Sequence, residues 1–409
     1  MWKRFQRMLR CPQCAGDLRL SVFAEHDVPL GPNHVSIARE CGLFDADFSI
    51  YVDAGLLACD MCEVCYPIVS GLPVLLPYAT KLHDEFARRF RSELSGLKRE
   101  FSFARREPAA GERFVQSSFS TEWLAYDFDG VIWEMDYQDH ERRFLIELGD
   151  YRPQRRCSTF LEVGCGIGIT TQLAQQNFHG DAVGIDLSLA ALRATARHRT
   201  NPFLHFVQGS VFYMPFSPES FDTIYSRGVL HHTHSTAKAF ASLASFCRPG
   251  GSAYLWVYGP RSKDDTPLRR GLFILERAVR RLLRGRAEGA VAKVLLACIA
   301  PGYMAFNWSR RLRDRTIQPY NFRRALHAAR DRFTPEFAHR HNDAEVREWF
   351  EAAGFIDVEV VDWRAMPSAD HDDYRRNTGV RGRKPRPPDS RAPAFMARVA
   401  TAGAASEQG

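Results

Sequence analysis

The 409-residue sequence contains no uninterrupted apolar stretch long enough to cross a bilayer. Its most hydrophobic stretch, residues 290–304, includes Lys293 and Pro301 and is shorter than the roughly 20 residues that a spanning helix needs. The N-terminal sequence MWKRFQRMLRCPQC carries charge but has neither the apolar core nor the small-residue cleavage site of a secretory signal. These absences predict no transmembrane segment and a cytoplasmic location.

Acidic residues are not in excess either. The 55 Lys and Arg residues outnumber the 48 Asp and Glu residues, which gives a formal net charge of +7. A mild positive excess is typical of an ordinary solvated surface, and it also fits an anionic partner such as a phosphate, a nucleic acid or a membrane surface. Apolar residues make up 45% of the chain, enough for one large α/β domain and a smaller module.

Four of the ten cysteines form two CxxC pairs, CPQC with Cys11 and Cys14, and CDMC with Cys59 and Cys62. Because the cytosol keeps thiols reduced, we expect metal ligands or packing residues rather than disulfides. Two such pairs can supply four thiolates to a tetrahedral zinc ion. Cys65 is a rival for the fourth position, and the alternative is a set of scattered free thiols.

The residues after the second pair, CYPIVSGLPVLLP, extend this pattern. With the two CxxC pairs they resemble the small zinc ribbon that activates transfer-RNA and translation-factor methyltransferases and is fused to the N-terminus of many bacterial methyltransferases. The match covers residues 9–77 apart from an insertion at about 21–56. The resemblance implies a structural zinc on Cys11, Cys14, Cys59 and Cys62, with Cys41 and Cys65 as extras. We expect a zinc-ribbon domain at 1–80, a charged linker with helical tendency at 81–112, and the main domain at 113–409.

From residue 158 strand and helix patterns alternate. Strands are expected at STFLEV, DAVGID, FLHFVQG, FDTIYS, GSAYLWVY, FIDVEVV and FMARVA, and helices from about Gly168, over SLAALRATAR and from about Ser235. Strands separated by helices indicate βαβ units, and therefore a doubly wound α/β fold around a parallel sheet. Residues 371–392, rich in Arg, Lys, Pro and Gly, are expected to form a loop before the last strand.

The chemistry begins at LEVGCGIG, residues 161–168, where three glycines allow a tight strand-to-helix turn beside a ligand. The dinucleotide fingerprint GxGxxG needs its third glycine where this chain has Ile169, which argues against a nicotinamide-dependent dehydrogenase. Asp186 ends the next strand, where a carboxylate can accept bonds from both ribose hydroxyls. Alternatively it caps the following helix, a role for which Ser188 is equally placed.

Five segments, LEVGCGIG, GIDLS, FVQGSVFYMPF, SFDTIYSRGVLHHT and RPGG, resemble in this order the motifs of class I S-adenosylmethionine-dependent methyltransferases of the small-molecule kind. The resemblance implies a seven-stranded, mostly parallel sheet with its last strand antiparallel. It also implies contacts to S-adenosylmethionine from Glu162, Gly164, Cys165, Gly166, Gly168, Asp186, Leu187, Ser210, Val211 and Ser226. Ser210 stands where the family usually has an Asp or Asn that binds the adenine amino group.

His231 and His232 follow the fourth strand, in the crevice where ligands of such sheets bind. They are the candidate catalytic bases, and the alternative is that they only shape the pocket. Phe119, Trp123, Tyr126 and Trp133 are interpreted as a packed cover over the sheet rather than as substrate contacts.

The connection between the fifth and sixth strands, residues 259–354, is too long for an ordinary loop. Its helical part, about 260–340, is interpreted as a lid over the acceptor pocket, with a basic amphipathic membrane surface as the alternative. Candidates for the pocket rim are His339, His341 and Asn342, of which Asn342 is expected to cap a helix beginning near Asp343.

The sequence thus predicts a methyltransferase acting on a small molecule or on a glycan or lipid precursor. One alternative is an RNA or protein methyltransferase that uses the ribbon for recognition. It is disfavoured because no NPPY-type tetrapeptide follows FDTIYS and because the arginines do not alternate with stacking aromatics. The other alternative is a scaffold that keeps the fold without catalysis.

Overall fold

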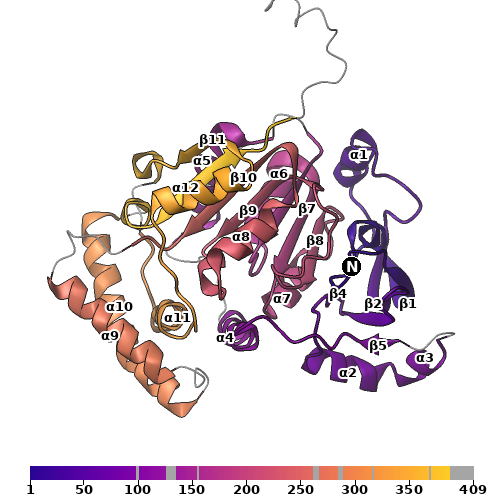
Figure 1. Ribbon diagram of the computed structural model, residues 1–409, viewed down its shortest axis with the longest axis horizontal. Coiled ribbons are helices and arrows are strands. Elements are labelled where there is room, and N and C mark those ends of the chain that lie inside the picture. Colours follow the sequence, from indigo (N-terminus) through magenta and orange to yellow (C-terminus); the bar gives the residue numbers. More distant parts are fainter. Residues whose placement is uncertain are drawn as a thin grey trace, which may run out of the picture.

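A computed structural model describes residues 1–97, 101–125, 135–153, 156–260, 267–283, 289–315, 317–367 and 370–386. Its centre is a seven-stranded sheet in the order β11-β12-β10-β9-β6-β7-β8 (Figure 1). The strands are β6 (Ser158–Val163), β7 (His179–Asp186), β8 (Leu204–Gln208), β9 (Phe221–Arg227), β10 (Cys247–Val257), β11 (Ile356–Val360) and β12 (Thr378–Arg383). Only β12 is antiparallel to its neighbours. The doubly wound, mostly parallel sheet is therefore confirmed.

The last strand lies earlier in the chain than the sequence pattern indicated. Strand β12 falls inside residues 371–392, which were expected to be a loop, whereas FMARVA lies outside the described residues. The loop prediction was wrong because β12 has little apolar content of its own. It is stabilised by ladders on both sides, in which Arg381 pairs with Tyr254 of β10 and with Glu359 of β11. Pairing with neighbours outweighs intrinsic propensity in such a strand.

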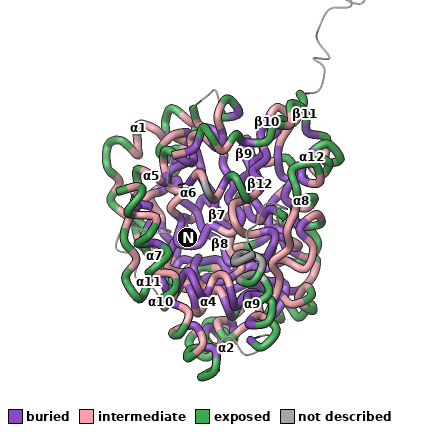
Figure 2. Tube along the Cα trace, turned by 90° about the vertical axis from the view of Figure 1, so that its left-hand side faces the viewer, coloured by how far each residue is buried: buried purple, intermediate pink, exposed green. Residues whose placement is uncertain are grey.

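Helices cover both faces of this sheet, as the alternation of side chains along the strands requires. One face packs Leu161, Val183 and Ile224 under α8 (Thr236–Ala244) and α12 (Asp343–Ala352). The other packs Phe160 and Tyr225 under helices α5 (Tyr137–Leu148), α6 (Ile169–Phe178) and α7 (Ala190–His198). Strands β7, β8 and β9 lie in the buried centre of the chain trace in Figure 2, whereas β11 is an exposed edge strand. The carboxyl ends of the parallel strands are left for a ligand site.

An N-terminal unit packs on the first face. It contains a second sheet in the order β1-β2-β3-β4, with β5 beside β3. Its elements are the 3₁₀ helix η1 (Lys3–Met8), β1 (Arg19–Asp27), α1 (Pro32–Glu40), β2 (Ile50–Cys59), β3 (Val64–Val69), β4 (Leu72–Pro73), α2 (Lys81–Arg89), α3 (Arg91–Ser95) and β5 (Ser102–Phe103). The first part of the expected linker, described at residues 81–97 and 101–103, contributes β5, and its helix α2 packs on this sheet through Phe86.

The unit takes the place of a crossover helix. Residues 209–220, all of them described, connect β8 to β9 without a helix. Leu9 bridges to Phe216 there, and the Arg10 N–H donates to the Pro215 carbonyl at 2.8 Å. Apolar residues of the unit and of the strands consequently share one core.

A buried ion pair fixes the same contact. The Arg4 guanidinium donates to the Asp181 carboxylate at 3.0 Å, and the His205 ring lies 3.1 Å from Asp181 and stacks on Phe5. Burial alone would raise the pKa of Asp181, but Arg4 and His205 outweigh it and lower that pKa. Such a pair resists separation, because breaking it leaves an uncompensated buried charge.

A disulfide joins Cys41, just after α1, to Cys157, just before β6. The expectation that the cysteines would be ligands or packing residues was wrong for this pair. The sequence did not reveal this pair, because its two cysteines are 116 positions apart in the chain.

The connection between β10 and β11 forms a helical insertion that extends from the sheet on the side of the molecule away from the N-terminal unit (Figure 1). It comprises α9 (Pro267–Leu283), α10 (Ala290–Arg313) and α11 (Phe322–Phe333), whose inner faces share a small apolar core. Helix α10 continues through Pro301. Among the described residues it is the one helix whose length and composition would let it cross a membrane, although only 22% of its apolar window is buried. Such a helix is weak evidence for a membrane span.

Candidate cofactor and acceptor site

The glycine loop after β6 has the backbone geometry that its sequence predicts. Gly164, Gly166 and Gly168 have φ values of 79°, 53° and 83°, a region that other residues rarely adopt. A Cβ on Gly164 would lie 2.1 Å from a Val229 methyl, and one on Gly168 would lie 2.6 Å from the Phe206 ring. The loop therefore requires these glycines.

Asp186, at the end of β7, holds this loop. Its carboxylate accepts from the Gly166 N–H at 2.8 Å, and from the Ser188 N–H and hydroxyl at 2.8 and 2.7 Å. Burial raises the pKa of Asp186, although these bonds act in the opposite direction. Asp186 thus supports the glycine loop and the residues that lead into α7. A contact to a ribose is compatible with these bonds.

The loop opens on a cavity of about 1170 Å³. Five of the residues implied by the methyltransferase motifs line it, namely Gly164, Asp186, Leu187, Ser210 and Val211. The other five, Glu162, Cys165, Gly166, Gly168 and Ser226, are not among its lining residues. Glu162 is buried and accepts from the Thr171 hydroxyl at 2.5 Å, while the Ser226 hydroxyl donates to the Val163 carbonyl at 3.0 Å. These two side chains support the loop from behind.

Glu112, at the start of α4 (Glu112–Ala125), is a site residue that the sequence did not reveal. It lines the cavity, is 6% exposed, and accepts from the Ala109 N–H at 2.7 Å. Burial raises its pKa, while a hydrogen bond from Ser210 has the opposite effect. A carboxylate thus lies beside Ser210, the position that lacks the usual acid.

The same helix covers the glycine loop. Phe119 and Trp123 line the cavity, and the Trp123 ring lies 3.2 Å from the position of a Cβ on Gly166. The expected aromatic cover thus extends over the glycine loop. Tyr126 and Trp133 lie outside the described residues.

The two candidate histidines lie in different surroundings. His232 lines the cavity, and its Nδ1 is 2.7 Å from the Phe337 carbonyl, whereas His231 is fully buried against Tyr258 and is not a lining residue. Burial lowers the pKa of His232 to about 3 and lowers that of His231 as well. Both rings are neutral at physiological pH and are weak bases.

Asp331 of α11 is a further candidate base. It lines the cavity and accepts from the Tyr258 hydroxyl at 3.2 Å. Burial, and then the charge of Glu122, raise the pKa of Asp331 to about 7. Since a general base works best when its pKa is near the working pH, this carboxyl is poised for proton transfer.

Three arginines converge on one carboxylate in the same cavity. Glu276 of α9 lies 3.2 Å from Arg280, 2.9 Å from Arg332 and 3.6 Å from Arg340. All four residues line the cavity. Even with a charged Asp331 included, the group keeps a net positive charge. The arrangement can bind a phosphate or carboxylate.

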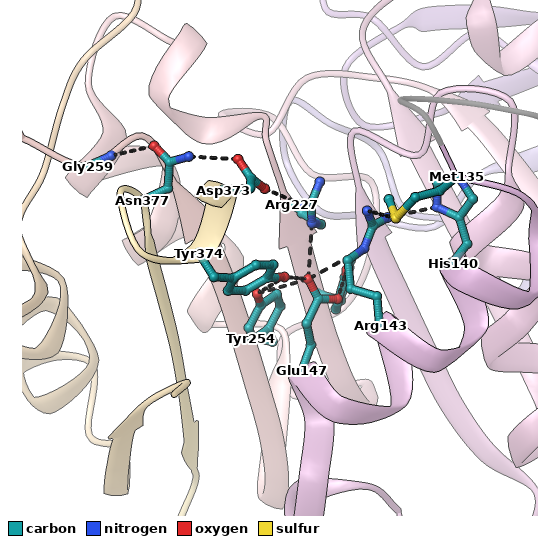
Figure 3. A network of polar contacts seen from close by, with 11 residues as sticks. Met135, His140, Arg143, Glu147, Arg227, Tyr254, Gly259, Asp373, Tyr374 and Asn377 are labelled. Carbon is teal, nitrogen blue, oxygen red and sulfur yellow. Dashed lines mark hydrogen bonds and ion pairs between the residues drawn. The ribbon is translucent and has the colours of Figure 1, made fainter. Parts of the chain in front are cut away.

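A buried network around Glu147 of α5 forms another part of the wall (Figure 3). Glu147 is fully buried and accepts from the hydroxyls of Tyr225, Tyr254 and Tyr374 and, at 3.0 Å, from Arg227. Arg227 also donates to Asp373 at 2.9 Å, and it lines the cavity with Asp373 and Tyr374 of α13 (His371–Tyr374). One carboxylate thus joins α5, β9, β10 and α13.

The three predicted rim residues mainly form hydrogen bonds within the protein. Asn342 caps α12 by accepting from the Glu345 N–H at 2.9 Å, as expected, and it also lines the cavity. His341 lies 2.7 Å from Glu345 and 2.9 Å from the Thr236 hydroxyl, and His339 lies 3.0 Å from the Thr233 carbonyl. Neither histidine is among the lining residues.

The two CxxC pairs come together in the N-terminal unit. The sulfur atoms of Cys11, Cys14, Cys59 and Cys62 all lie within 4.8 Å of one another. Four thiolates at this spacing fit the tetrahedral coordination of zinc. Cys65 is buried in a separate apolar cluster with Phe86, so it is not a rival for this site.

Parts of the chain are similar to known methyltransferases. Residues 161–255 match the methyltransferase domain family. A demethylmenaquinone methyltransferase of Roseiflexus castenholzii is 36% identical over 38% of this chain and 64% of its own length. Phosphoethanolamine N-methyltransferase 2 of Caenorhabditis elegans is 22% identical over 55% of this chain and 50% of its own. The solved Haemonchus contortus phosphoethanolamine N-methyltransferase 2 shares 17% identity, with a TM-score of 0.39 over 66% of this chain and 57% of that one.

The chain spans half or less of the length of the first curated relatives that it matches. The matched segment nevertheless runs from within β6 to within β10 and includes the glycine loop and Asp186, which build one edge of the cavity. Residues 161–255 are therefore similar to a methyltransferase domain, and they form part of the doubly wound sheet described above.

Proposed function

We propose that the protein transfers a methyl group from S-adenosylmethionine to an anionic small molecule or to a glycan or lipid precursor. The observation that carries the proposal is that one cavity is lined both by Gly164, Asp186 and Ser210 and by the arginine cluster at Glu276. Several relatives are named for small acceptors, including phosphoethanolamine and demethylmenaquinone.

The residues divide the chemistry between two ends of this cavity. The bound cofactor supplies an electrophilic methyl group. Gly164, Asp186 and Ser210 hold and orient it at the strand ends, while Trp123 excludes water from the loop. The arginine cluster fixes the acceptor, and Asp331, oriented by Tyr258, accepts the proton that the acceptor loses. Alignment and proton removal are the main demands of such an in-line displacement.

The proposal is tested by labelled transfer into a cell extract. The protein should bind S-adenosylmethionine in a calorimetric titration and then transfer its labelled methyl group to a product that anion exchange retains. Label in neutral products alone would contradict the anionic acceptor. Absence of cofactor binding would contradict the enzymatic activity and favour the alternative of a non-catalytic scaffold.

We further propose that the four-cysteine cluster holds a structural zinc and that the N-terminal unit is a zinc ribbon. All four ligand positions are filled by protein thiolates, which is typical of structural rather than catalytic sites. The unit contacts Pro215 and Phe216 in the loop that also supplies Ser210 to the cavity. A metal that stabilises this unit would therefore also stabilise the loop that places Ser210 in the cavity.

Replacing Cys59 with Ser should remove the metal. We expect close to one zinc per wild-type chain by elemental analysis, little in Cys59→Ser, and an unfolding temperature lower by roughly 5 °C or more. Cys298→Ser, which alters an exposed thiol on α10, is the matched control and should change neither value. Equal zinc contents in the two variants would refute the site.

Replacing Glu112 with Ala should weaken binding of the cofactor roughly tenfold to a hundredfold, because a charge-assisted hydrogen bond to the adenine edge is lost. Calorimetry measures the affinity. Adding Ser210→Asp in the Glu112→Ala background should restore it, since the carboxylate then stands at the usual position. In the wild-type background the same substitution places two carboxylates together and should not help. Unchanged affinity in Glu112→Ala would remove Glu112 from the site.

A further inference from the structure

The outer face of α10 is apolar along its whole length. Exposed residues recur at spacings of three and four, which places them on one side of a helix: Val291, Val294, Cys298, Pro301, Ala305, Trp308 and Leu312. At 1.5 Å per residue this stripe is about 32 Å long. The side chains of Val294 and Trp308 are each 63% exposed. Neither the cofactor site nor the arginine cluster uses this face.

The insertion concentrates such side chains. Of the fifteen exposed large hydrophobic residues in the described part of the chain, nine fall between residues 274 and 322, among them Ile274 and Leu282 of α9. Scattered exposed hydrophobic residues are ordinary, but a contiguous apolar surface marks a contact with a partner or a membrane.

The charge beside the stripe is of one sign. Among the side chains of α9 and α10 that the structure describes, the exposed charged residues are Arg277, Arg281, Lys293 and Arg313. Residues 289–313 contain no Asp or Glu, and the one acid of α9, Glu276, is buried against arginines. Apolar side chains with exposed cations beside them on the same helices complement an anionic lipid surface.

The inner face of α10 is occupied by protein. Leu296 and Ala300 are buried, and the Asn307 side chain donates to the Gln318 carbonyl at 3.2 Å and accepts from the Tyr320 N–H at 2.8 Å. Because the inner face of α10 packs against protein, only its outer face can contact lipid. This geometry fits a helix lying in the plane of a membrane surface.

We propose that the apolar stripe of α10 docks the protein on an anionic bilayer. Phe306 and Arg310 of the same helix line the acceptor cavity, so docking brings the rim of that cavity to the lipid. An amphiphilic acceptor with an anionic headgroup can then enter without leaving the membrane. Docking itself requires neither cofactor nor methyl transfer, so its test stands apart from that of the enzymatic activity.

The test is flotation of the full chain with phosphatidylcholine vesicles that contain or lack phosphatidylglycerol. We expect binding only to the anionic vesicles, weakening as salt is added. The double variant Val294→Asp, Trp308→Asp should bind at least roughly tenfold less, because it places two charges in the apolar contact. Ile356→Asp, at a 48% exposed residue of β11, is the matched control and should bind as the wild type does. Lys293→Gln and Arg313→Gln should each weaken binding about fivefold.

Cofactor affinity and thermal unfolding of each variant serve as the check on folding, and both should match the wild type because the altered side chains are exposed. Three results would overturn the proposal: no vesicle binding, equal binding to both vesicle types, or binding unaffected by the double Asp variant. If the double variant instead dissociates a dimer while vesicles bind neither form, the stripe is an interface between two copies of this chain.

Discussion

Replacing Asp331 with Asn should lower the turnover number roughly 10²- to 10⁴-fold, the loss typical of removing a general base. Affinity for the cofactor should stay unchanged, because Asp331 belongs to α11 and the cofactor edge is built by the strand ends. Asp343→Asn, which alters an exposed acid lining the same cavity, is the matched control and should retain most of the activity.

The pH profile separates Asp331 from His232. A base must be deprotonated to act, so with Asp331 the rate should rise with pH through about 7, the value to which burial raises its pKa. That limb should vanish in Asp331→Asn. With His232 as the base, whose pKa burial lowers to about 3, the rate would be flat through neutral pH. A wild-type profile without a rising limb near 7 would exclude Asp331.

The same shift affects stability. The pKa of Asp331 in the folded protein exceeds the usual value of about 3.9 for an unfolded chain, so the folded state binds the proton more tightly. Its contribution favours folding below about pH 4 and is lost as the pH rises through about 7. Thermal unfolding of Asp331→Asn should depend less on pH across this window than that of the wild type.

Replacing Glu147 with Ala should cost roughly 3–5 kcal/mol of unfolding free energy, the largest stability effect that we expect. The substitution leaves Arg227, itself 16% exposed in its side chain, without its buried counter-charge and removes the acceptor of three tyrosine hydroxyls. Denaturant unfolding followed by circular dichroism measures the loss.

Two controls make this result specific. Glu147→Gln keeps an acceptor oxygen and should lose less than Glu147→Ala. Glu359→Gln removes a carboxylate that also pairs with an arginine, Arg381 at 3.0 Å, but whose side chain is 52% exposed. An exposed pair contributes about 0–1 kcal/mol, so this variant should be nearly neutral. Equal losses of unfolding free energy in Glu147→Ala and Glu359→Gln would show that the buried network contributes no more to stability than an exposed ion pair.

The cofactor edge of the cavity could be predicted because it is local in sequence. Gly164 and Asp186 lie at the ends of neighbouring parallel strands, and such ends meet at one edge of a sheet. The two CxxC pairs could be predicted for the same reason, since each pair places two thiols within four consecutive residues. In both cases a short run of residues fixes its own geometry.

The acceptor side could not be predicted in this way. Asp331 acquires its chemistry from Tyr258, 73 residues earlier in the chain, and from burial that no local pattern indicates. Glu147 meets Tyr374 across 227 residues, and Cys41 meets Cys157 across 116. Strand β12 has too few apolar residues to stand out before its two neighbours are in place.

By itself, the sequence determined the order of strands from β6 to β11, the cofactor loop and the thiolate cluster, because these depend on neighbouring residues and on side-chain periodicity. Only the tertiary structure decided which carboxylate carries a pKa near 7, where an anionic acceptor fits, and which face of α10 remains uncovered. Burial and the convergence of charges arise from contacts between distant segments, and these contacts exist only in the folded chain.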